Sequence, residues 1–371
     1  MTVAIIATGF IGAIGLIEAK NNQKHILSVL VFFLFLLLLM GGNCDNADYL
    51  NYQLRYQMTT NIEDIESSYW AYFFSLFFFN QCGVSFVAYH FFIYGLGLFF
   101  IFLLMRKTTK WSLLFLILYC IYPMMMDPTQ MKNFVAMTIF SYAVTFLVES
   151  SRKNDLKYIL FLILSAGFHI VFLIYLPLLL FRKIIDLKYF TPILISGIFI
   201  LSVLFSYTSL NSALMGTMKS LIADDISAKE AYFIQGVHWG YLPYLMANII
   251  VCINANYLRK KAKVSDVLTL YQKKFLDVCF LISVYAFLFV PFYQFTLDFA
   301  RFFRDLFLII HAGIVLGLQA LSVSSQRFVI SIKQSTVLSI YILILIVLFG
   351  WDIFRVYDTV VYPLFHSNVL F

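Results

Sequence analysis

Two arginines lie between two aspartates near the start of a late apolar run, in the string TLDFARFFRDLFLII. Asp298 lies three residues before Arg301 and Asp305 lies four residues after it, so both carboxylates can reach its guanidinium on one helix face. We therefore expect Arg301 to be paired and Arg304 to be partly available. Guanidinium groups bind phosphate oxygens in a bidentate manner, so this spacing fits the binding of a pyrophosphate. The alternative is an ion-pair network with a purely structural role.

A second polar cluster lies in the segment 41–83. It contains two carboxylates, a guanidinium and three phenols at spacings of three and four: Asp45, Asp48, Tyr49, Tyr52, Arg55 and Tyr56. On a helix, this spacing places them broadly on one face. Carboxylates and arginine bind hydroxyl groups, and aromatic rings cover the C–H face of a sugar, so the pattern favours a sugar-binding surface. The alternative is a helix at the membrane interface, where tyrosine and tryptophan are common.

Two isolated ionisable groups also have types suited to binding or catalysis. Lys132 lies just inside the start of an apolar run, where a charge is costly unless it faces the protein interior. It can contact a lipid-linked phosphate, or it can extend to the outer headgroups. His169 lies in the middle of another apolar run, and its imidazole is a candidate general base or substrate ligand. The alternative is that His169 caps a helix break, and we interpret His90 and His311 as structural.

No sequence motif indicates a cofactor or a metal. The five cysteines lack the spacing of metal ligands, and the chain has no Walker motif and no glycine-rich nucleotide loop. We therefore predict that the protein uses no cofactor and no metal. A disulfide between Cys44 and Cys82 is a less favoured alternative to free thiols.

Membrane helices must position these residues. Hydrophobic residues make up 62% of the 371 residues and charged residues 12%, against about 25% in an ordinary soluble domain. A water-soluble fold of this chain could not bury so much apolar surface. The apolar runs are continuous, which excludes the alternating strands of a β-barrel. The sequence therefore predicts an all-α polytopic membrane protein with one integral membrane domain over 1–371. Its candidate spans are 2–17, 26–40, 84–105, 111–126, 131–148, 190–208, 240–257, 275–292, 302–320 and 336–350.

The apolar run 158–181 decides the predicted topology. Basic clusters lie on both sides of this run, at 152–157 and 182–188. Lysine and arginine mark cytoplasmic loops, and a single crossing would place one of these clusters outside. We therefore favour a re-entrant helical hairpin that bends near Gly167–His169, with its broken ends facing protein or a watery cavity.

With this hairpin, the chain has ten full spans and an outer N-terminus. Of the 26 lysines and arginines, 19 fall in predicted cytoplasmic loops, whereas 13 of the 19 acidic residues fall outside. The net charge of +7 then reflects membrane orientation, and no nucleic-acid partner is predicted. The long polar segments, 41–83, 209–239, 291–301 and 351–371, all lie outside. We therefore expect an extracytoplasmic working face, with the C-terminal tail folded back over it.

Several strings occur in an order that resembles a known family. DNADYLNY resembles its D…Y motif, QMKNFVAM resembles its R-x-x-x-A span start, and AGFHIVFLIYLPLLL resembles its FH…LP hairpin. DFARFFRDLFLI resembles its late arginine-aromatic span, and YPLFHSN resembles its closing P…N element. Together these strings, from about 41 to 368, resemble the EpsG family of polysaccharide polymerases, which are Wzy-type O-antigen or capsule polymerases. This chain departs from the pattern at Lys132, where arginine is usual, and lacks the arginine that usually precedes the D…Y motif.

The resemblance implies a membrane glycosyltransferase (GT-C-like) architecture in the bacterial plasma (inner) membrane. It implies exopolysaccharide or lipopolysaccharide biosynthesis, in which a growing glycan passes from undecaprenyl pyrophosphate to a lipid-linked repeat unit. The implied partners are an undecaprenyl-pyrophosphate-linked oligosaccharide, membrane lipid and a chain-length regulator protein. The alternatives are a lipid-linked oligosaccharide flippase or other transporter, an O-antigen ligase and a membrane acyltransferase.

Residue roles follow from the resemblance together with the chemistry above. Cations would stabilise the pyrophosphate leaving group, and a carboxylate or imidazole would take the acceptor proton. The candidate catalytic residues are His169, Asp48 and Arg304. The candidate substrate-binding residues are Arg301, Lys132, Asp45, Tyr49, Tyr52 and Arg55.

Overall fold

A computed structural model describes residues 26–184, 241–294, 297–321 and 332–369, together with residues 193, 196, 197 and 200. The described residues form helices, turns and one isolated β-bridge, and they include no β-strand. The predicted span 2–17, the polar segment 209–239 and all but those four residues of the predicted span 190–208 lie outside the described residues. The prediction of an all-helical protein is confirmed for the part of the chain that is described.

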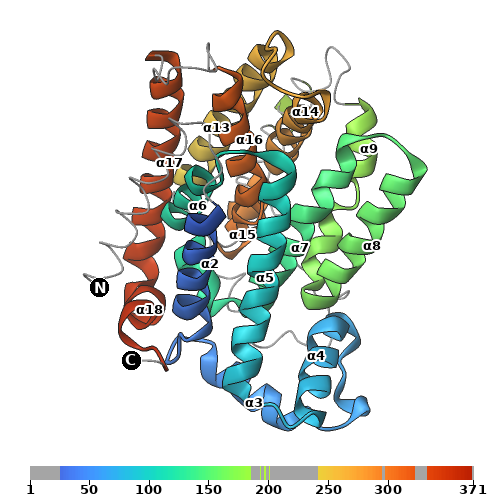
Figure 1. Ribbon diagram of the computed structural model, residues 1–371, viewed down its shortest axis with the longest axis vertical. Helices are drawn as coiled ribbons and strands as arrows, with labels where there is room; N and C mark the ends of the chain where they lie inside the picture. The colour runs from blue at the N-terminus through green and yellow to red at the C-terminus, as the bar shows by residue number, and fades with distance from the viewer. Residues whose placement is uncertain are drawn as a thin grey trace.

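The helices differ in length, and short 3-10 segments interrupt several of them (Figure 1). The α-helices are α2 (Ile26–Gly41), α3 (Tyr49–Met58), α4 (Trp70–Gln81), α5 (Phe86–Thr108), α6 (Ser112–Ile121), α7 (Met131–Val144), α8 (Arg152–Phe168), α9 (Leu178–Ile184), α13 (Leu242–Lys263), α14 (Leu270–Tyr285), α15 (Arg301–Arg304), α16 (Phe307–Ala320), α17 (Ile332–Val356) and α18 (Tyr362–His366). The 3-10 segments include Met124–Thr129, Ile170–Tyr175, Ala286–Gln294 and Leu297–Ala300, and a π-helical turn covers Tyr357–Val361.

Five helical stretches in the described residues are long and apolar enough to cross a membrane. They are Phe86–Thr108, Met131–Val148, Leu270–Tyr293, Arg301–Ala320 and Lys333–His366. The helices at Ile26–Gly41 and Ser112–Ile121 are apolar but shorter. The helices are therefore compatible with a multi-pass membrane protein, and the sequence's figure of ten spans remains a prediction.

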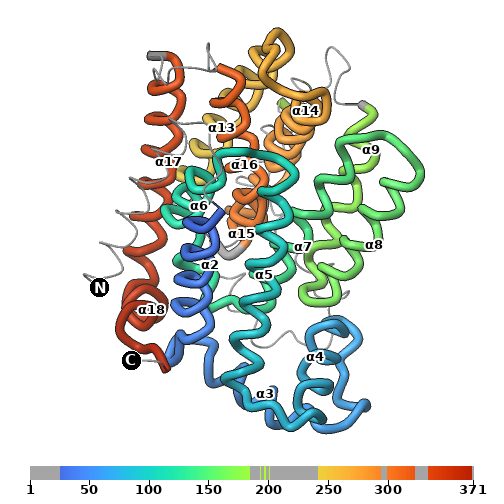
Figure 2. Tube along the Cα trace, viewed as in Figure 1, coloured from blue at the N-terminus to red at the C-terminus, as the bar shows by residue number. Residues whose placement is uncertain are grey.

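Three predicted cytoplasmic loops that the structure describes in full, 106–110, 149–157 and 258–274, lie at one end of the helix bundle, the upper end in Figure 1 and Figure 2. Gln272 at the start of α14 donates to the backbone carbonyl of Thr108 at the end of α5. Lys107 and Tyr271 both bond to Thr145, which follows α7. Loops far apart in the sequence thus share one end, as the distribution of basic residues predicts.

The described parts of the predicted outer segments 41–83 and 351–371 lie together at the opposite end (Figure 1). The backbone N–H of Cys44 donates to the carbonyl of Ser367 at 2.9 Å, and the N–H of Val369 donates to the carbonyl of Gly42 at 2.8 Å. A side chain added at Gly42 would collide with Asn368, so the close approach of the tail requires glycine here. The C-terminal tail therefore folds back over the segment that follows α2, as the sequence predicts.

The predicted re-entrant run does form a helical hairpin, α8 and α9, with the break at His169. The hydroxyl of Tyr158 donates to the carbonyl of Tyr175 at 2.7 Å across the hairpin. Arg182 forms an ion pair with Asp155 at 2.9 Å, so the two basic flanks lie side by side. This geometry confirms the reversal of the chain on which the predicted topology depends.

Two buried histidines have structural partners. His90 lies within 2.8 Å of the carbonyl of Gly41, which joins α5 to the end of α2. His311 in α16 bonds to the carbonyl of Tyr122 at 2.7 Å and to the hydroxyl of Tyr341 at 2.8 Å. Both rings link helices in the core, which agrees with the structural interpretation from the sequence.

Candidate functional site

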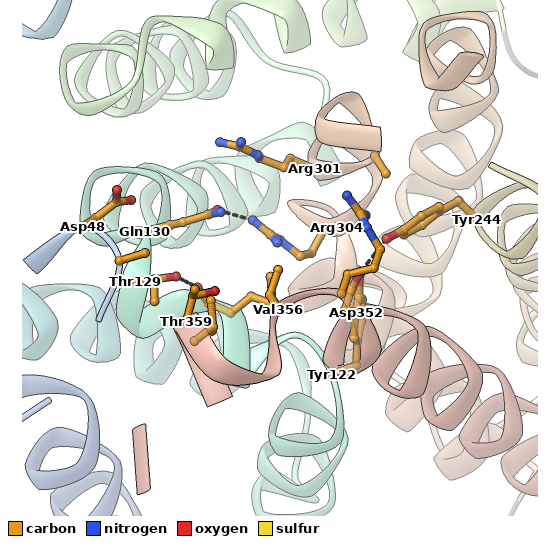
Figure 3. A pocket seen from close by; sticks show the side chains of 15 residues that line it. Asp48, Tyr122, Thr129, Gln130, Tyr244, Arg301, Arg304, Asp352, Val356 and Thr359 are labelled. Atoms are coloured by element: carbon orange, nitrogen blue, oxygen red, sulfur yellow. Dashed lines mark hydrogen bonds between the residues drawn. The ribbon is translucent and has the colours of Figure 1, made fainter. Parts of the chain in front are cut away.

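A cavity of about 300 Å³ opens at the end of the bundle that carries the predicted outer segments. Three arginines, two aspartates and one glutamine contribute polar side chains to its lining: Arg301, Arg304, Arg355, Asp48, Asp352 and Gln130. Figure 3 shows five of these groups, namely Asp48, Gln130, Arg301, Arg304 and Asp352, approaching the cavity from separate segments of the chain. Such a concave site with a few converging charged groups is the usual form of a small-molecule or substrate site.

The charged and polar residues that line the cavity lie at or near the ends of helices. Arg301 and Arg304 form the single turn of α15, which is continuous with the buried helix α16. Asp352 and Arg355 are three residues apart in the last turns of α17 and therefore lie on the same side of that helix. Gln130 immediately precedes α7. Helix ends thus place charged side chains at one edge of an apolar bundle.

Arg304 is buried in the wall, which corrects the expectation that it is partly available. Only 5% of its surface is exposed, and its guanidinium donates to the side-chain oxygen of Gln130 (Figure 3). The carboxylates of Asp127, Asp305 and Asp352 act on it electrostatically. Burial removes most of the water that would stabilise this cation, and the negative charge of these acidic groups opposes that cost.

Each of the three carboxylates around Arg304 also accepts a hydrogen bond from a neutral side chain. Tyr119 donates to Asp127 at 2.6 Å, Asn133 to Asp305 at 2.8 Å and Tyr244 to Asp352 at 2.5 Å. Burial raises the pKa of Asp127, which lies between two helices, to about 7. These contacts link α6, α7, α13 and α17 through one buried polar network. We conclude that this network fixes the geometry of the cavity.

Asp48 faces the cavity from the residue before α3 and is half-buried. Burial raises the pKa of its carboxyl group, and the nearby cations Arg301 and Lys132 oppose that rise. A partly desolvated carboxylate with a raised pKa is a stronger base than one in water. Asp48 therefore has the position and the electrostatic environment of a general base.

Lys132 and His169 both contact the ring of Tyr69. The ammonium nitrogen of Lys132 lies 4.2 Å from the ring centre of Tyr69 and 5.3 Å from that of Tyr72. The ring of His169 meets Tyr69 edge to face, with ring centres 5.9 Å apart. Lys132 interacts electrostatically with Asp48, which lines the cavity. Lys132, Tyr69 and His169 therefore form a row that extends from Asp48 towards the hairpin. His169 itself does not line the cavity.

The expectation that the cluster in 41–83 shares one helix face is wrong in part. Asp45 precedes α3 and has a φ of 63°, so it is not on the helix at all. Arg55 points away from the cavity and forms a surface ion pair with Glu66 at 3.0 Å. Helix α3 begins only at Tyr49, and its inward face consists of aromatic rings rather than of charges. The sequence spacing fits a helix, but the helix starts later than the spacing implies.

The two remaining tyrosines of the cluster differ in their surroundings. Tyr49 is half-buried and packs edge to face on Phe86 and His90. Tyr52 is buried, and its hydroxyl faces the backbone N–H groups at the start of α7, next to Lys132. Burial raises the pKa of Tyr52 above its usual value, so it is a neutral hydrogen-bonding group. Neither tyrosine lines the cavity, but Tyr52 interacts electrostatically with Asp48, which does.

The structure adds cavity residues that sequence reasoning missed, namely Gln130, Tyr244, Asp352 and Arg355. Asp352 and Arg355 carried a signal, because charges three residues apart interrupt the end of an apolar run. Tyr244 and Gln130 carried none, because a single polar residue at a helix start is common. Cys44 and Cys82 are both free, so the alternative of a disulfide is wrong. The side chain of Asp298 lies outside the described residues.

Comparison with known protein families identifies the chain over nearly all of its length. The sequence model of the EpsG family matches residues 26–366. No curated protein and no solved structure matches the chain. The matched range includes every residue that lines the cavity, as well as the hairpin and most of the C-terminal tail.

Proposed function

Because the chain belongs to the EpsG family, we propose that it transfers a growing glycan from undecaprenyl pyrophosphate to a lipid-linked repeat unit at the extracytoplasmic face of the plasma membrane. The family is a glycosyltransferase-like family of polysaccharide polymerases, and the apolar helices fit a multi-pass membrane protein. The donor, the acceptor and the side of the membrane are details that we propose beyond the family membership. The observation that supports them is the cavity with a carboxylate facing several cations, at the end remote from the basic loops.

The cations of the cavity suit a pyrophosphate leaving group. Arg301 is half-buried and Arg355 is exposed, and both line the cavity. Guanidinium groups bind phosphate oxygens in a bidentate manner and keep their charge at any pH at which the protein is folded. We assign the two phosphates of the donor to Arg301 and Arg355. Arg304 then acts through the wall, because it holds Gln130 in place and is itself buried.

Asp48 is the group that we assign as the base. In the proposed step, an acceptor hydroxyl oxygen forms a bond to the anomeric carbon of the donor sugar while the bond to the pyrophosphate oxygen breaks. The hydroxyl proton passes to the Asp48 carboxylate, and the bonding electrons leave with the pyrophosphate, whose charge the arginines stabilise. Asp48 is preferred to His169 because Asp48 lines the cavity and His169 does not.

We assign the row beside the cavity to the acceptor sugar. Tyr69 offers a half-buried aromatic ring, Lys132 offers a cation and His169 extends the row towards the hairpin. Aromatic rings cover the C–H face of a sugar, whereas the polar groups bind hydroxyls. In this assignment the donor enters on the arginine side of Asp48 and the acceptor on the lysine side. The whole chain acts as one integral membrane domain.

Reconstitution with a single substrate tests the proposed function. The purified protein is placed in lipid vesicles with undecaprenyl-pyrophosphate-linked repeat units as the only saccharide. The proposal predicts a ladder of longer lipid-linked glycans and release of undecaprenyl pyrophosphate. A parallel sample also contains lipid A core, and transfer only to that core indicates a ligase. Leaflet exchange of the repeat unit without any new glycosidic bond indicates a flippase. Either of these two results contradicts the proposal.

A further inference from the structure

Helix α3 exposes an aliphatic stripe on the face opposite its buried tyrosines. Leu50, Leu54 and Met58 follow one another every four residues and are 64%, 55% and 72% exposed. At 100° per residue they lie within an 80° arc, directly across the helix from the buried rings of Tyr52 and Tyr56. A helix that faces water places polar residues at the centre of its exposed face, whereas here the polar residues flank an apolar centre.

Helix α4 repeats this arrangement with aromatic residues. Trp70, Phe74 and Phe78 are also spaced by four and are 43%, 52% and 52% exposed. The opposite face of α4 buries Tyr72 and Leu76 against the rest of the protein. Six large apolar side chains are thus exposed on two neighbouring short helices. Exposed apolar surface of this kind marks a contact with a protein or a membrane.

The two helices form one unit, because the polar side chains at the end of α4 bond to the end of α3. The side-chain amide of Asn80 donates to the backbone carbonyls of Tyr56 at 2.8 Å and Thr59 at 3.2 Å. Gln81 donates to the carbonyl of Thr60 at 2.7 Å. These bonds occupy side chains of α4 that water would otherwise solvate. Figure 1 shows α3 and α4 together at the lower end of the molecule, with α3 across the foot of α5.

The exposed apolar surface of these helices continues onto a spanning helix. Phe79 of α4 packs on Phe92 of α5, with ring centres 4.6 Å apart. Phe92 is 47% exposed and lies in Phe86–Thr108, which is long and apolar enough to cross the membrane. Phe78 contacts Phe79, and Phe74 stacks with Phe78, so the aromatic surface runs without a polar break from α5 onto α4. The exposed apolar surface of α5 therefore continues over α4.

We propose that α3 and α4 form an interfacial ledge, whose exposed stripes are covered by the acyl chains of the lipid bilayer. Bilayer hydrocarbon is the occupant because the stripes continue the exposed face of a spanning helix and have no charged side chain at their centre. The ledge holds Asp48, which directly precedes α3, at a fixed depth relative to the membrane surface. This inference does not depend on the reaction that the cavity performs.

Tryptophan fluorescence in vesicles tests the ledge. We compare Leu54→Trp and Leu50→Trp on the stripe with Glu63→Trp on the exposed polar turn after α3, each in vesicles of phosphatidylcholine with and without brominated acyl chains. The emission added to that of the wild-type protein is measured for each variant. The two stripe variants are expected to add blue-shifted emission and lose most of it in brominated lipid, whereas the Glu63→Trp emission is unchanged.

Two outcomes overturn the proposal. Added emission from both stripe variants that resists brominated lipid but is quenched by aqueous iodide shows that the stripe faces water. Emission that neither quencher reduces shows that another protein surface, such as a second copy of the chain, covers the stripe. Gel filtration and a thermal unfolding curve for each variant exclude misfolded protein, and agreement between the two stripe variants excludes a local effect of one substitution.

Discussion

Arg304 and Arg301 are predicted to fail in different ways when they are replaced. Arg304 is 5% exposed and interacts electrostatically with three carboxylates, so Arg304→Ala removes the buried cation that opposes their negative charge. Breaking a buried ion pair in this way costs about 3–5 kcal/mol of folding stability. Arg301 is only half-buried, and Arg301→Gln removes a phosphate contact rather than a structural charge. Loss of a hydrogen bond to a charged group, about 1.5–3 kcal/mol, corresponds to a roughly 10- to 150-fold fall in kcat/KM.

Two measurements on each variant separate these effects. Thermal unfolding in detergent reports stability, and the vesicle polymerisation assay reports kcat/KM. We expect Arg304→Ala to lower Tm and the yield of folded protein, whereas Arg301→Gln keeps the wild-type Tm and loses activity. Arg304→Lys keeps a charge and should recover part of the lost stability. An Arg304→Ala protein with the wild-type Tm and no activity would refute the reasoning, because it would place Arg304 against the substrate rather than in the wall.

Three further predictions follow from individual contacts. Activity should fall as pH decreases through the raised pKa of Asp48, and because Arg301 holds that pKa down, the acid limb of the pH–rate profile should move to higher pH in Arg301→Gln. Gly42→Ala should push the C-terminal tail away, since the new methyl group would lie 2.7 Å from the carbonyl oxygen of Leu38 and against Asn368; we expect a loss of about 1–3 kcal/mol and faster proteolysis of the tail. Arg55→Ala should change the unfolding free energy by less than about 1 kcal/mol, because its ion pair with Glu66 is exposed, and a larger drop in Tm would contradict that description.

The hairpin and the two ends of the bundle could be predicted from charge alone. Basic residues flank 158–181 on both sides, and one physical rule, that lysine and arginine stay on the cytoplasmic side, requires the chain to turn back. The contact between Arg182 and Asp155 agrees with that inference. This part of the fold was accessible because the rule acts on clusters of residues and does not depend on how any one side chain packs.

The burial of Arg304 could not be predicted in the same way. Apart from Asp305, the carboxylates that act on it electrostatically are Asp127 and Asp352, which lie in other helical segments. Sequence spacing within one run shows only local partners, so it predicts that Arg301 is paired and that Arg304 is available. Likewise, Tyr244 and Asp352 meet across 108 residues, and no local pattern indicates that contact.

The start of α3 shows a third kind of limit. Spacings of three and four from 45 to 56 fit a helix, but Asp45 adopts a left-handed conformation and the helix begins at Tyr49. Aspartate tolerates that conformation better than most residues, so its presence in a polar segment fits a turn as well as a helix. The charged residues at 45 and 55 therefore point elsewhere, while Asp48 reaches the cavity.

The measurement that tests the central claim most directly is the rate of polymerisation by Asp48→Asn in vesicles that contain only the lipid-linked repeat unit. Glu63→Gln, an exposed acidic residue of the same segment, is the matched control, and substrate binding is measured alongside the rate. If the cavity is the site of transfer and Asp48 takes the proton, Asp48→Asn binds substrate with nearly wild-type affinity but forms new glycosidic bonds at least about 100-fold more slowly, whereas the control is normal. A rate for Asp48→Asn equal to that of Glu63→Gln would contradict the account.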